Sequence, residues 1–438
     1  MIVAALALAA LAQQPADSAR GRPCVIAIDS LPRGGQNLQN YYGGGGVRLH
    51  CQGTHTTLAS DSIAYYAALA RLDMVGHVKI RDTTIALDCN FASYYTKQER
   101  LDAHNNVVAV NRDNHSTLRG PNLTYYRAVP GVRDTMEMFA SQRPTIEYHG
   151  DADSTEPYRI VADRVRFKGN DRMWGGGTVT IDRSDLAARG DSMSLDQTTG
   201  LGVLVGSPSV TGKGATSYTL VGTRIELGLA HREVNLVKAL GKGKATGADW
   251  ILTADTIHLH VRDRKLQQAF AWGDSSRAHA VSTTNTITAD SLAMDVPDQV
   301  LTEARAYRKA VSTSKRDSVA AETTRDWIGG DTLTARWRQA PDSTGTPRTV
   351  LHRVVSIGKA RAFTHLYPSK SDTTAKSTEP SINYSRGDTI IVVMKAAKID
   401  TVLVMGHVDG VQADPLPPQK PDTTKQHADS TKHPLVKP

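Results

Sequence analysis

The chain has 438 residues, of which 22% are charged and 39% hydrophobic, and its formal net charge is +8. This composition predicts a folded chain, and the low aromatic content of 5% favours many thin layers over one thick core. Basic residues form no long block and do not alternate with aromatic ones, which argues against a nucleic-acid partner.

The N-terminus reads MIVAALALAALAQQPADSAR. Residues 2–12 are apolar but too few to span a bilayer as a helix, and Ala10-Leu11-Ala12 offers the small residues that a signal peptidase reads. We expect residues 1–12 to be a signal peptide, cleaved near Ala12, and the mature chain to be exported to the periplasm. No later segment reaches 18 consecutive apolar residues, so a soluble mature protein is expected.

The three cysteines are Cys24, Cys51 and Cys89. In an exported chain they allow one disulfide, for which Cys51–Cys89 is the expected pair, with one thiol left over. The alternative is that all three are small buried or free thiols. Their spacing contains no CxxC and predicts no metal site.

An N-terminal segment, 13–40, precedes the run YYGGGGVRLH at residues 41–50. Four glycines suggest a phosphate-binding loop, but such a loop requires a following helix, and Val47-Arg48-Leu49-His50 indicates a strand. The glycines therefore predict a tight turn or a bulge at the first strand.

A repeat then runs along the chain. Its first part is a short polar anchor, often Ala-Asp or Gly-Asp, followed by apolar residues at alternate positions, which is typical of half-buried strands. Copies start at residues 59, 86, 118, 161, 188, 220, 252, 287, 328 and 385.

A glycine and a second alternating stretch usually follow each anchor, as in GHVKI from 76, GGTVTI from 176, GKARA from 358 and GHVDG from 406. Each unit is therefore about two strands and two turns. No amphipathic helix separates the units, which excludes helical and leucine-rich solenoids and alternating βα folds.

The anchor position is acidic in most copies: Asp61, Asp163, Asp191, Asp255, Asp290, Asp331 and Asp388. A carboxylate that recurs once per unit at a strand start indicates a structural turn rather than a catalytic or calcium site.

Other signatures of chemistry are missing from the sequence. His258 and His260 share one strand face, opposite Ile257 and Leu259, and no third metal ligand is evident. No Gly-x-Ser-x-Gly motif places a serine nucleophile. We predict no enzyme, no cofactor and no metal site.

Three phrases carry a family resemblance: GVRLHCQGTHTTLASDSIAYY, LDMVGHVKIRDTTIALDCNFASYY and LDAHNNVVAVNRDNHSTLRGPNLTYY. They are similar to the tandem unit of the OstA-like, or LptA-type, family of periplasmic lipopolysaccharide-transport proteins. The resemblance is best over residues 43–148 and continues more weakly to about residue 412. Pro121 and Thr223 depart from it by replacing the anchor acid, and residues 340–381 break the spacing.

The resemblance implies an all-β fold, an elongated antiparallel β-jellyroll built as a taco-like stack of about ten two-strand repeats. The repeats would occupy 41–215 and 216–412, either as one jellyroll or as two consecutive modules divided near residue 215. Polar loops are expected at 340–349 and 369–381, and the polar, Pro-rich tail at 413–438 is expected to be disordered.

The resemblance further implies an apolar groove that holds the acyl chains of lipopolysaccharide and carries them towards the outer membrane. The side chains two and four positions after each anchor are the expected groove residues: Ile63, Tyr65, Leu123, Val165, Phe167, Met193, Leu195, Ile225, Leu227, Ile257, Leu259, Leu292, Met294, Leu333, Ile390 and Val392. The same side chains would fill the core of a structural or adhesive β-solenoid without lipid cargo, which stays the alternative.

The implied partners are lipopolysaccharide or a related envelope glycolipid, and other β-jellyroll transport proteins joined by end-to-end strand addition. Contact with membrane-embedded partners would be peripheral. No nucleic acid is expected.

Overall fold

The computed structural model describes residues 24–129, 131–149, 156–214, 217–230, 233–297, 300–314, 325–341, 347–366, 380–395 and 398–415. Strands dominate these residues, and Ala67–Leu69 forms a 3-10 turn. The predicted all-β fold is confirmed. Within the described ranges, no helix has the length and apolarity needed to cross a membrane.

The chain forms two compact units. The first comprises Met1–Ser282 and Asp290–Ala304, and the second comprises Thr283–Ala289 and Arg305–Pro438. The sequence suggested a possible division near residue 215, but residues on both sides of that position belong to the first unit.

The first unit contains strands β1 (Ile26–Ser30), β2 (Arg33–Asn37), β3 (Asn40–Cys51), β4 (Thr57–Tyr66), β5 (Arg71–Arg81), β6 (Ile85–Tyr95), β7 (Arg100–Asn111), β8 (Thr117–Tyr126), β9 (Glu137–Ser141), β10 (Thr145–Tyr148), β11 (Tyr158–Val161), β12 (Arg164–Lys168), β13 (Arg172–Asp182), β14 (Leu186–Asp196), β15 (Leu201–Val205), β16 (Ser209–Gly212), β17 (Tyr218–Val221), β18 (Arg224–Ala230), β19 (Glu233–Thr246), β20 (Trp250–Arg262), β21 (Lys265–Trp272), β22 (Ala278–Ser282) and β24 (Ser291–Asp295). The second contains β23 (Asn285–Ala289), most of β25 (Glu303–Ser314), β26 (Trp327–Pro341), β27 (Pro347–Leu366), β28 (Ser381–Lys395), β29 (Lys398–Met405) and β30 (Asp409–Ala413).

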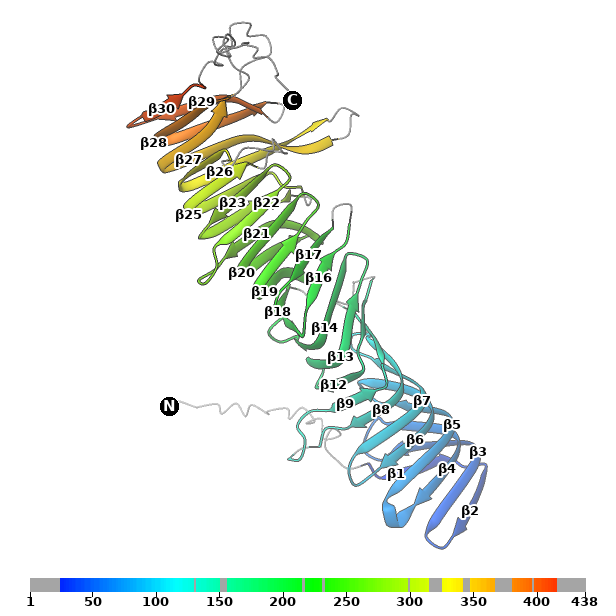
Figure 1. Ribbon diagram of the computed structural model, residues 1–438. Coiled ribbons are helices and arrows are strands. Elements are labelled where there is room, and N and C mark those ends of the chain that lie inside the picture. Colours follow the sequence, from blue (N-terminus) through cyan, green and yellow to red (C-terminus); the bar gives the residue numbers. More distant parts are fainter. Residues whose placement is uncertain are drawn as a thin grey trace, which may run out of the picture. The chain divides into compact units, whose positions relative to one another are not determined.

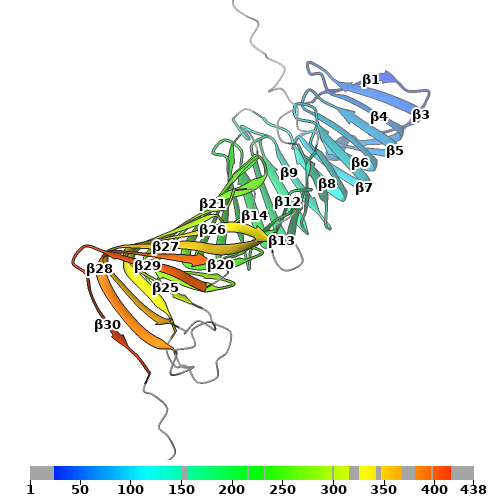
Figure 2. The same ribbon diagram turned by 90° about the horizontal axis from the view of Figure 1, so that it is seen from above.

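Neighbouring strands of the first unit pair antiparallel in chain order, as β3 to β8 show most clearly (Figure 1). Figure 2 shows the same strands side by side from a second direction. Each long strand is interrupted near its middle by a register shift, for example between Gly44 and Val47 in β3 and between Val75 and Val78 in β5. Later layers are split at this point into two short strands, such as β9 and β10, which pair with the two ends of β8.

The row of bulges divides the sheet of the first unit into two halves. Half A consists of β1, 47–51 of β3, 57–60 of β4, 78–81 of β5, 85–88 of β6, 107–111 of β7, 117–120 of β8, β10, β11, 179–182 of β13, 186–190 of β14, β16, β17, 243–246 of β19, 250–254 of β20 and β22. Half B consists of β2, 40–44 of β3, 62–66 of β4, 71–75 of β5, 91–95 of β6, 100–104 of β7, 122–126 of β8, β9, β12, 172–176 of β13, 192–196 of β14, β15, β18, 233–240 of β19, 256–262 of β20, β21 and β24.

The two halves face each other with their apolar sides inward. Side chains from half A, such as Ile85 and Leu87, and from half B, such as Tyr94 and Leu101, line the same small internal cavity. The sheet therefore folds over at the bulges, which we call the corner, because a bulge bends a strand and increases its twist. The hairpin turns of the two halves meet at the opposite side, which we call the open edge.

The corner requires glycine for two reasons: the backbone has a positive φ there, and a neighbouring carboxylate leaves no room for a Cβ atom. Gly76 and Gly177 have φ of +77° and +76°. A Cβ added at Gly76 would clash with Oδ2 of Asp61, and one at Gly177 with Oδ2 of Asp163. The N–H of Asp163 donates to the carbonyl of Gly177 at 2.9 Å. The anchor acids were expected at strand starts. This holds for Asp163 and Asp290, which directly precede β12 and β24, but the other five lie inside continuous strands: Asp61, Asp191, Asp255, Asp331 and Asp388.

The run YYGGGG contains the first such corner. Gly45 and Gly46 have φ of +88° and +93° and occupy the register shift of β3. The glycines were predicted to form a tight turn or a bulge, and they form a bulge in β3.

The disulfide joins Cys24 to Cys51, with a Cα–Cα distance of 4.9 Å, and Cys89 is a buried free thiol. The expected Cys51–Cys89 pair was wrong because Cys51 lies on β3 and Cys89 on β6, with β4 and β5 between them. Residues 26–37 of the expected N-terminal segment form β1 and β2, which pair with β3 as an additional layer.

The expected polar loop at 340–349 is instead a hairpin in its described parts, where Ala340 pairs with Arg348. The expected signal peptide at 1–12, residues 369–379 of the second loop, and residues 416–438 of the tail lie outside the described residues.

Candidate functional site

The candidate site is the interior between the facing parts of the folded sheet. All predicted groove residues are buried except Tyr65 and Phe167, which are half-buried. Ile225, Ile257 and Leu259 have no exposed surface at all. The alternation therefore identified the inward face correctly, and burying each large aliphatic side chain contributes about 1.5–3 kcal/mol.

Side chains largely fill the interior of the first unit. One cavity of about 60 Å³ is lined by Phe167 and Leu195. Two others of about 40 Å³ each are lined by Leu123 in one case and by Met193, Leu195 and Leu227 in the other. These spaces hold a few water-sized molecules and no acyl chain, so the first unit as described is a packed core.

The second unit contains a larger internal space. A cavity of about 460 Å³ is lined by apolar side chains of β26, β27, β28 and β29 and by a similar number of polar ones, among them Asn285 of β23 and Ser312 of β25. Its volume lies within the range of about 300–1,000 Å³ that ligand pockets occupy. Its apolar lining comprises Trp327, Ile328, Val350, Leu351, Val354, Val392, Met394 and Ile399. Of the predicted groove residues, Val392 lies in this cavity.

Polar groups border the same cavity. Arg338 and Arg348 line it and are exposed. Asp326 also lines it, and its carboxylate accepts from the backbone N–H of His365 at 2.9 Å and lies 2.7 Å from Nδ1 of that ring. The cavity thus combines an apolar lining with cationic side chains.

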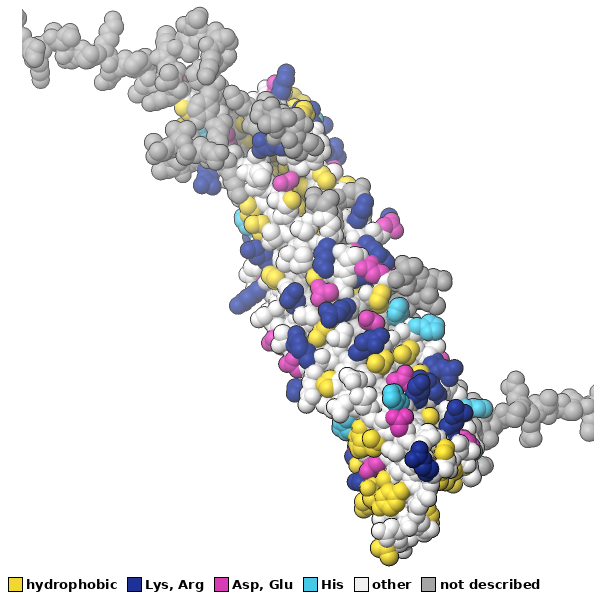
Figure 3. All heavy atoms as spheres, turned by 90° about the vertical axis from the view of Figure 1, so that its right-hand side faces the viewer, with side chains coloured by type: hydrophobic (Ala, Val, Ile, Leu, Met, Phe, Trp, Pro, Cys, Tyr) yellow, Lys and Arg dark blue, Asp and Glu magenta, His cyan; other side chains and the backbone are white. Residues whose placement is uncertain are grey.

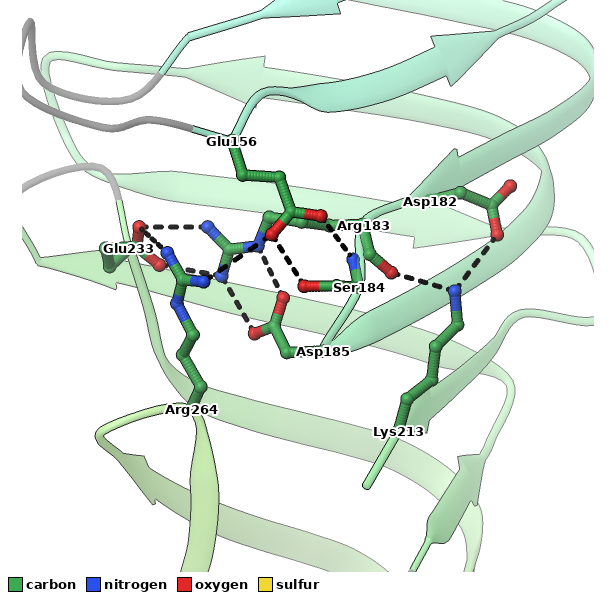
Figure 4. A network of polar contacts seen from close by, with 8 residues as sticks. All are labelled: Glu156, Asp182, Arg183, Ser184, Asp185, Lys213, Glu233 and Arg264. Carbon is green, nitrogen blue, oxygen red and sulfur yellow. Dashed lines mark hydrogen bonds and ion pairs between the residues drawn. The ribbon is translucent and has the colours of Figure 1, made fainter. Parts of the chain in front are cut away.

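The open edge of the first unit is crossed by a group of charged residues that we call the Arg183 cluster: Glu156, Arg183, Ser184, Asp185, Glu233 and Arg264 (Figure 4). Arg183 lies in the half A turn between β13 and β14, and its side chain is 1% exposed. It donates to Asp185 at 2.5 and 2.9 Å and contacts both carboxylate oxygens of Glu233, at 2.9 and 2.7 Å. Because Glu233 begins β19 in half B, the guanidinium joins the two halves.

A second bridge lies beside it. Arg264, in the half B turn between β20 and β21, lies 3.6 Å from Glu156 and 3.4 Å from Glu233. The hydroxyl and backbone N–H of Ser184 donate to Glu156 at 2.6 and 2.9 Å. These bonds, the hydroxyl first, lower the pKa of Glu156 and keep it charged.

The N-terminal layer is tied across the same edge. Cys24 is bonded to Cys51 of half A, while its backbone N–H donates to Glu99 in a half B turn at 2.5 Å. Glu99 also accepts from the hydroxyl of Tyr94 at 2.5 Å, and burial raises the pKa of Tyr94. Through its disulfide and its backbone hydrogen bond, Cys24 therefore connects half A with half B.

The sequence contained no signal for these bridges. In the sequence, Arg183 and Asp185 are typical of an ordinary polar turn. Glu233, the partner of Arg183 on the other half, is 50 residues away in the chain. Short-range patterns do not show which turns of a folded sheet face each other.

His258 and His260 lie on the outward face of β20. The ring of His258 lies edge-to-face against Trp272, with centres 4.6 Å apart, and that of His260 edge-to-face against Phe270, with centres 5.3 Å apart, while Ile257 and Leu259 point inward, as predicted. Within the part of the chain that the structure describes, no three His, Cys, Asp or Glu residues are placed to hold a metal ion. Figure 3 shows acidic and basic side chains mixed over one face, with hydrophobic side chains gathered at its lower end.

A comparison with protein-family models finds no match, and a comparison with curated proteins finds no significant similarity.

Proposed function

We propose that the protein is a non-enzymatic periplasmic carrier or bridge that holds the acyl chains of lipopolysaccharide or a related envelope glycolipid. The observation that carries the proposal is the cavity of about 460 Å³ in the second unit, with apolar side chains over part of its lining and two arginines. Acyl chains bind such a lining without directional bonds, at about 0.8 kcal/mol for each buried CH₂ group.

The arginines support a charged lipid in particular. Glycolipids of this class carry phosphate groups, and guanidinium groups bind phosphate through paired hydrogen bonds. A lipid whose chains entered between Leu351, Val392 and Met394 could place a phosphate at Arg338 and Arg348, which border the same cavity.

A structural β-solenoid without cargo is the second candidate, and one observation favours it. The first unit buries its inward side chains, and its interior contains cavities of about 40–60 Å³. In a carrier, this unit would have to separate at the open edge, where the Arg183 cluster joins the halves.

Photo-crosslinking tests the proposal. A benzoylphenylalanine at Met394 lies in the cavity, whereas one at Ile357, which is 53% exposed on β27 of the same unit, serves as the matched control. Lipopolysaccharide should be captured at Met394 and not at Ile357. Ala340→Trp, which places a large ring in the cavity, should reduce the capture at Met394.

A third position addresses the first unit. Capture at Ile257, in addition to Met394, would show that the packed core opens for lipid. Equal, weak labelling at Met394 and Ile357 in a folded protein would refute the carrier proposal and favour the structural solenoid.

A further inference from the structure

The outer surface of half B contains a groove on the side of the sheet that faces away from the packed interior. It lies over β8, β9, β12, β13, β14 and β15 and has a volume of about 820 Å³. All of these strands belong to the first unit. Because it lies on the face of a sheet rather than at an edge, its backbone groups are already paired and cannot accept an added strand.

Local sequence explains why the surface is hollow. Across the strands, Phe139 pairs with Arg166, Arg166 with Trp174, and Trp174 with Ser194. In the next row, Arg164 pairs with Gly176, and Gly176 with Ser192. Each row of cross-strand neighbours thus starts with large side chains and ends with glycine or serine. The small residues form the floor of the groove.

The large side chains present flat, exposed rings. Phe139 and Trp174 are each 37% exposed, and Phe139 also lies edge-to-face against Tyr126, with the ring centres 6.0 Å apart. The guanidinium carbon of Arg166 lies 5.3 Å from the centre of the Phe139 ring and 5.5 Å from that of Trp174. This stacking holds the two rings on either side of a fixed cation.

The charge of the groove is positive. Arg166 is paired with Glu137 at 3.2 Å. Arg164 is exposed, lies over Gly176, and forms no ion pair with a described residue. One guanidinium is therefore available for an anionic group, next to two aromatic rings and two serine hydroxyls.

We infer that this groove binds an acidic saccharide. The C–H faces of sugar rings pack on Phe139 and Trp174, sugar hydroxyls bond to Ser192 and Ser194, and a carboxylate or phosphate on the sugar pairs with Arg164. The site is separate from the cavity of the second unit and does not depend on the lipid proposal.

Single-stranded nucleic acid is the competing ligand for aromatic rings beside arginines. The groove favours a saccharide because it offers one guanidinium without an ion pair to a described residue, whereas a nucleic-acid binder neutralises several phosphates along the strand.

The test uses the full chain and calorimetric titration with oligogalacturonate, with neutral maltohexaose of the same length, and with oligothymidylate. Oligogalacturonate should bind, and Trp174→Ala should weaken its Kd about tenfold, the effect of losing a central aromatic contact. Trp272→Ala is the matched control, because Trp272 is 36% exposed on β21 outside the groove, and it should leave the Kd unchanged. Arg164→Gln should reduce binding of the acidic sugar to the level of the neutral one.

Two further arms identify the source of the sugar. Delipidated lipopolysaccharide core oligosaccharide represents a glycolipid headgroup, and oligogalacturonate represents a free acidic polysaccharide. Binding of either one, lost in Trp174→Ala, supports the proposal, and the tighter ligand identifies the source. Failure of every saccharide to bind the folded protein, or binding of oligothymidylate alone, would overturn it. Lipid capture at Met394 should be unchanged in Trp174→Ala, so the two proposals can fail separately.

Discussion

Arg183, in the turn between β13 and β14, and Glu233, at the start of β19, form a two-point ion pair at 2.9 and 2.7 Å, although they lie 50 residues apart in the chain and on opposite halves of the folded sheet. The guanidinium is almost completely buried and is also held by Asp185. A buried cation with two carboxylate partners fixes the separation of the two halves at this point of the open edge.

Loss of this pair should loosen the open edge. Glu233→Gln leaves Arg183 bound to Asp185 but removes its partner on half B, and we expect the free energy of unfolding to fall by about 1–2 kcal/mol, since Glu233 is 39% exposed and partly screened. Urea unfolding measures the change, and hydrogen exchange at residues 183–186 should become faster.

Glu226→Gln provides the control for that experiment. Glu226 pairs with Arg224, two residues away on the same strand, and joins no opposing elements. Its replacement should leave both measurements nearly unchanged. An equal effect of the two substitutions would contradict the role of Glu233 at the open edge.

The corner glycines should tolerate no side chain. Gly177→Ala places a Cβ at φ of +76° and against the carboxylate of Asp163, and we expect a loss of about 1–3 kcal/mol in unfolding free energy. Asp163→Ala should recover part of the loss by removing the clash but not the strain. Gly35→Ala, on the exposed strand β2 with open space around it, is the control and should change the unfolding free energy little. Thermal unfolding of the three variants measures these changes.

The thiols should react in a defined order. Burial raises the pKa of the Cys89 thiol to about 11, so in the native protein below that pH it stays protonated and reacts slowly with iodoacetamide. Denaturation without reductant should expose one thiol, and denaturation with reductant three. Mass spectrometry should find the first label on Cys89; a label on Cys24 would instead support the Cys51–Cys89 pair.

Removal of the disulfide should lower stability. Cys24→Ser releases a link with a sequence separation of 27, for which a loss of about 3 kcal/mol is expected. Cys89→Ser leaves the link intact and should preserve resistance to unfolding in non-reducing urea gradients.

Two histidines should titrate on opposite sides of their ordinary pKa. A hydrogen bond to Asp388, aided by its negative charge, raises the pKa of His407. Burial, aided by Lys238, lowers the pKa of His258. The contribution of His407 to the free energy of unfolding is thus fully present below about pH 6.5 and is lost as the pH rises through its raised pKa. The contribution of His258 is fully present above about pH 6.5 and is lost as the pH falls through its lowered pKa.

Nuclear magnetic resonance titration of the ring protons tests both signs. Asp388→Asn should return the pKa of His407 towards about 6.5 and leave that of His258 unchanged. A raised pKa of His407 that persists in Asp388→Asn would show that the hydrogen bond is not its cause.

Much of the fold followed from local pattern. Side chains alternate between the two faces of a strand, so the positions of Ile257 and Leu259 inside and of His258 and His260 outside could be predicted without knowledge of any partner. The repeated glycine was visible for a similar reason, because the corner recurs in successive layers and imposes the same backbone requirement on each.

The tertiary structure decided what depends on residues distant in the chain. The partner of Cys51 is Cys24 because β1 pairs with the end of β3, and the partner of Arg183 is Glu233 because their turns face each other across the open edge. The amount of space inside also depends on side chains from facing strands: they fill the first unit and leave about 460 Å³ in the second. Alternation determines which side chains point inward, but only the packing of both walls determines whether a cavity is left between them.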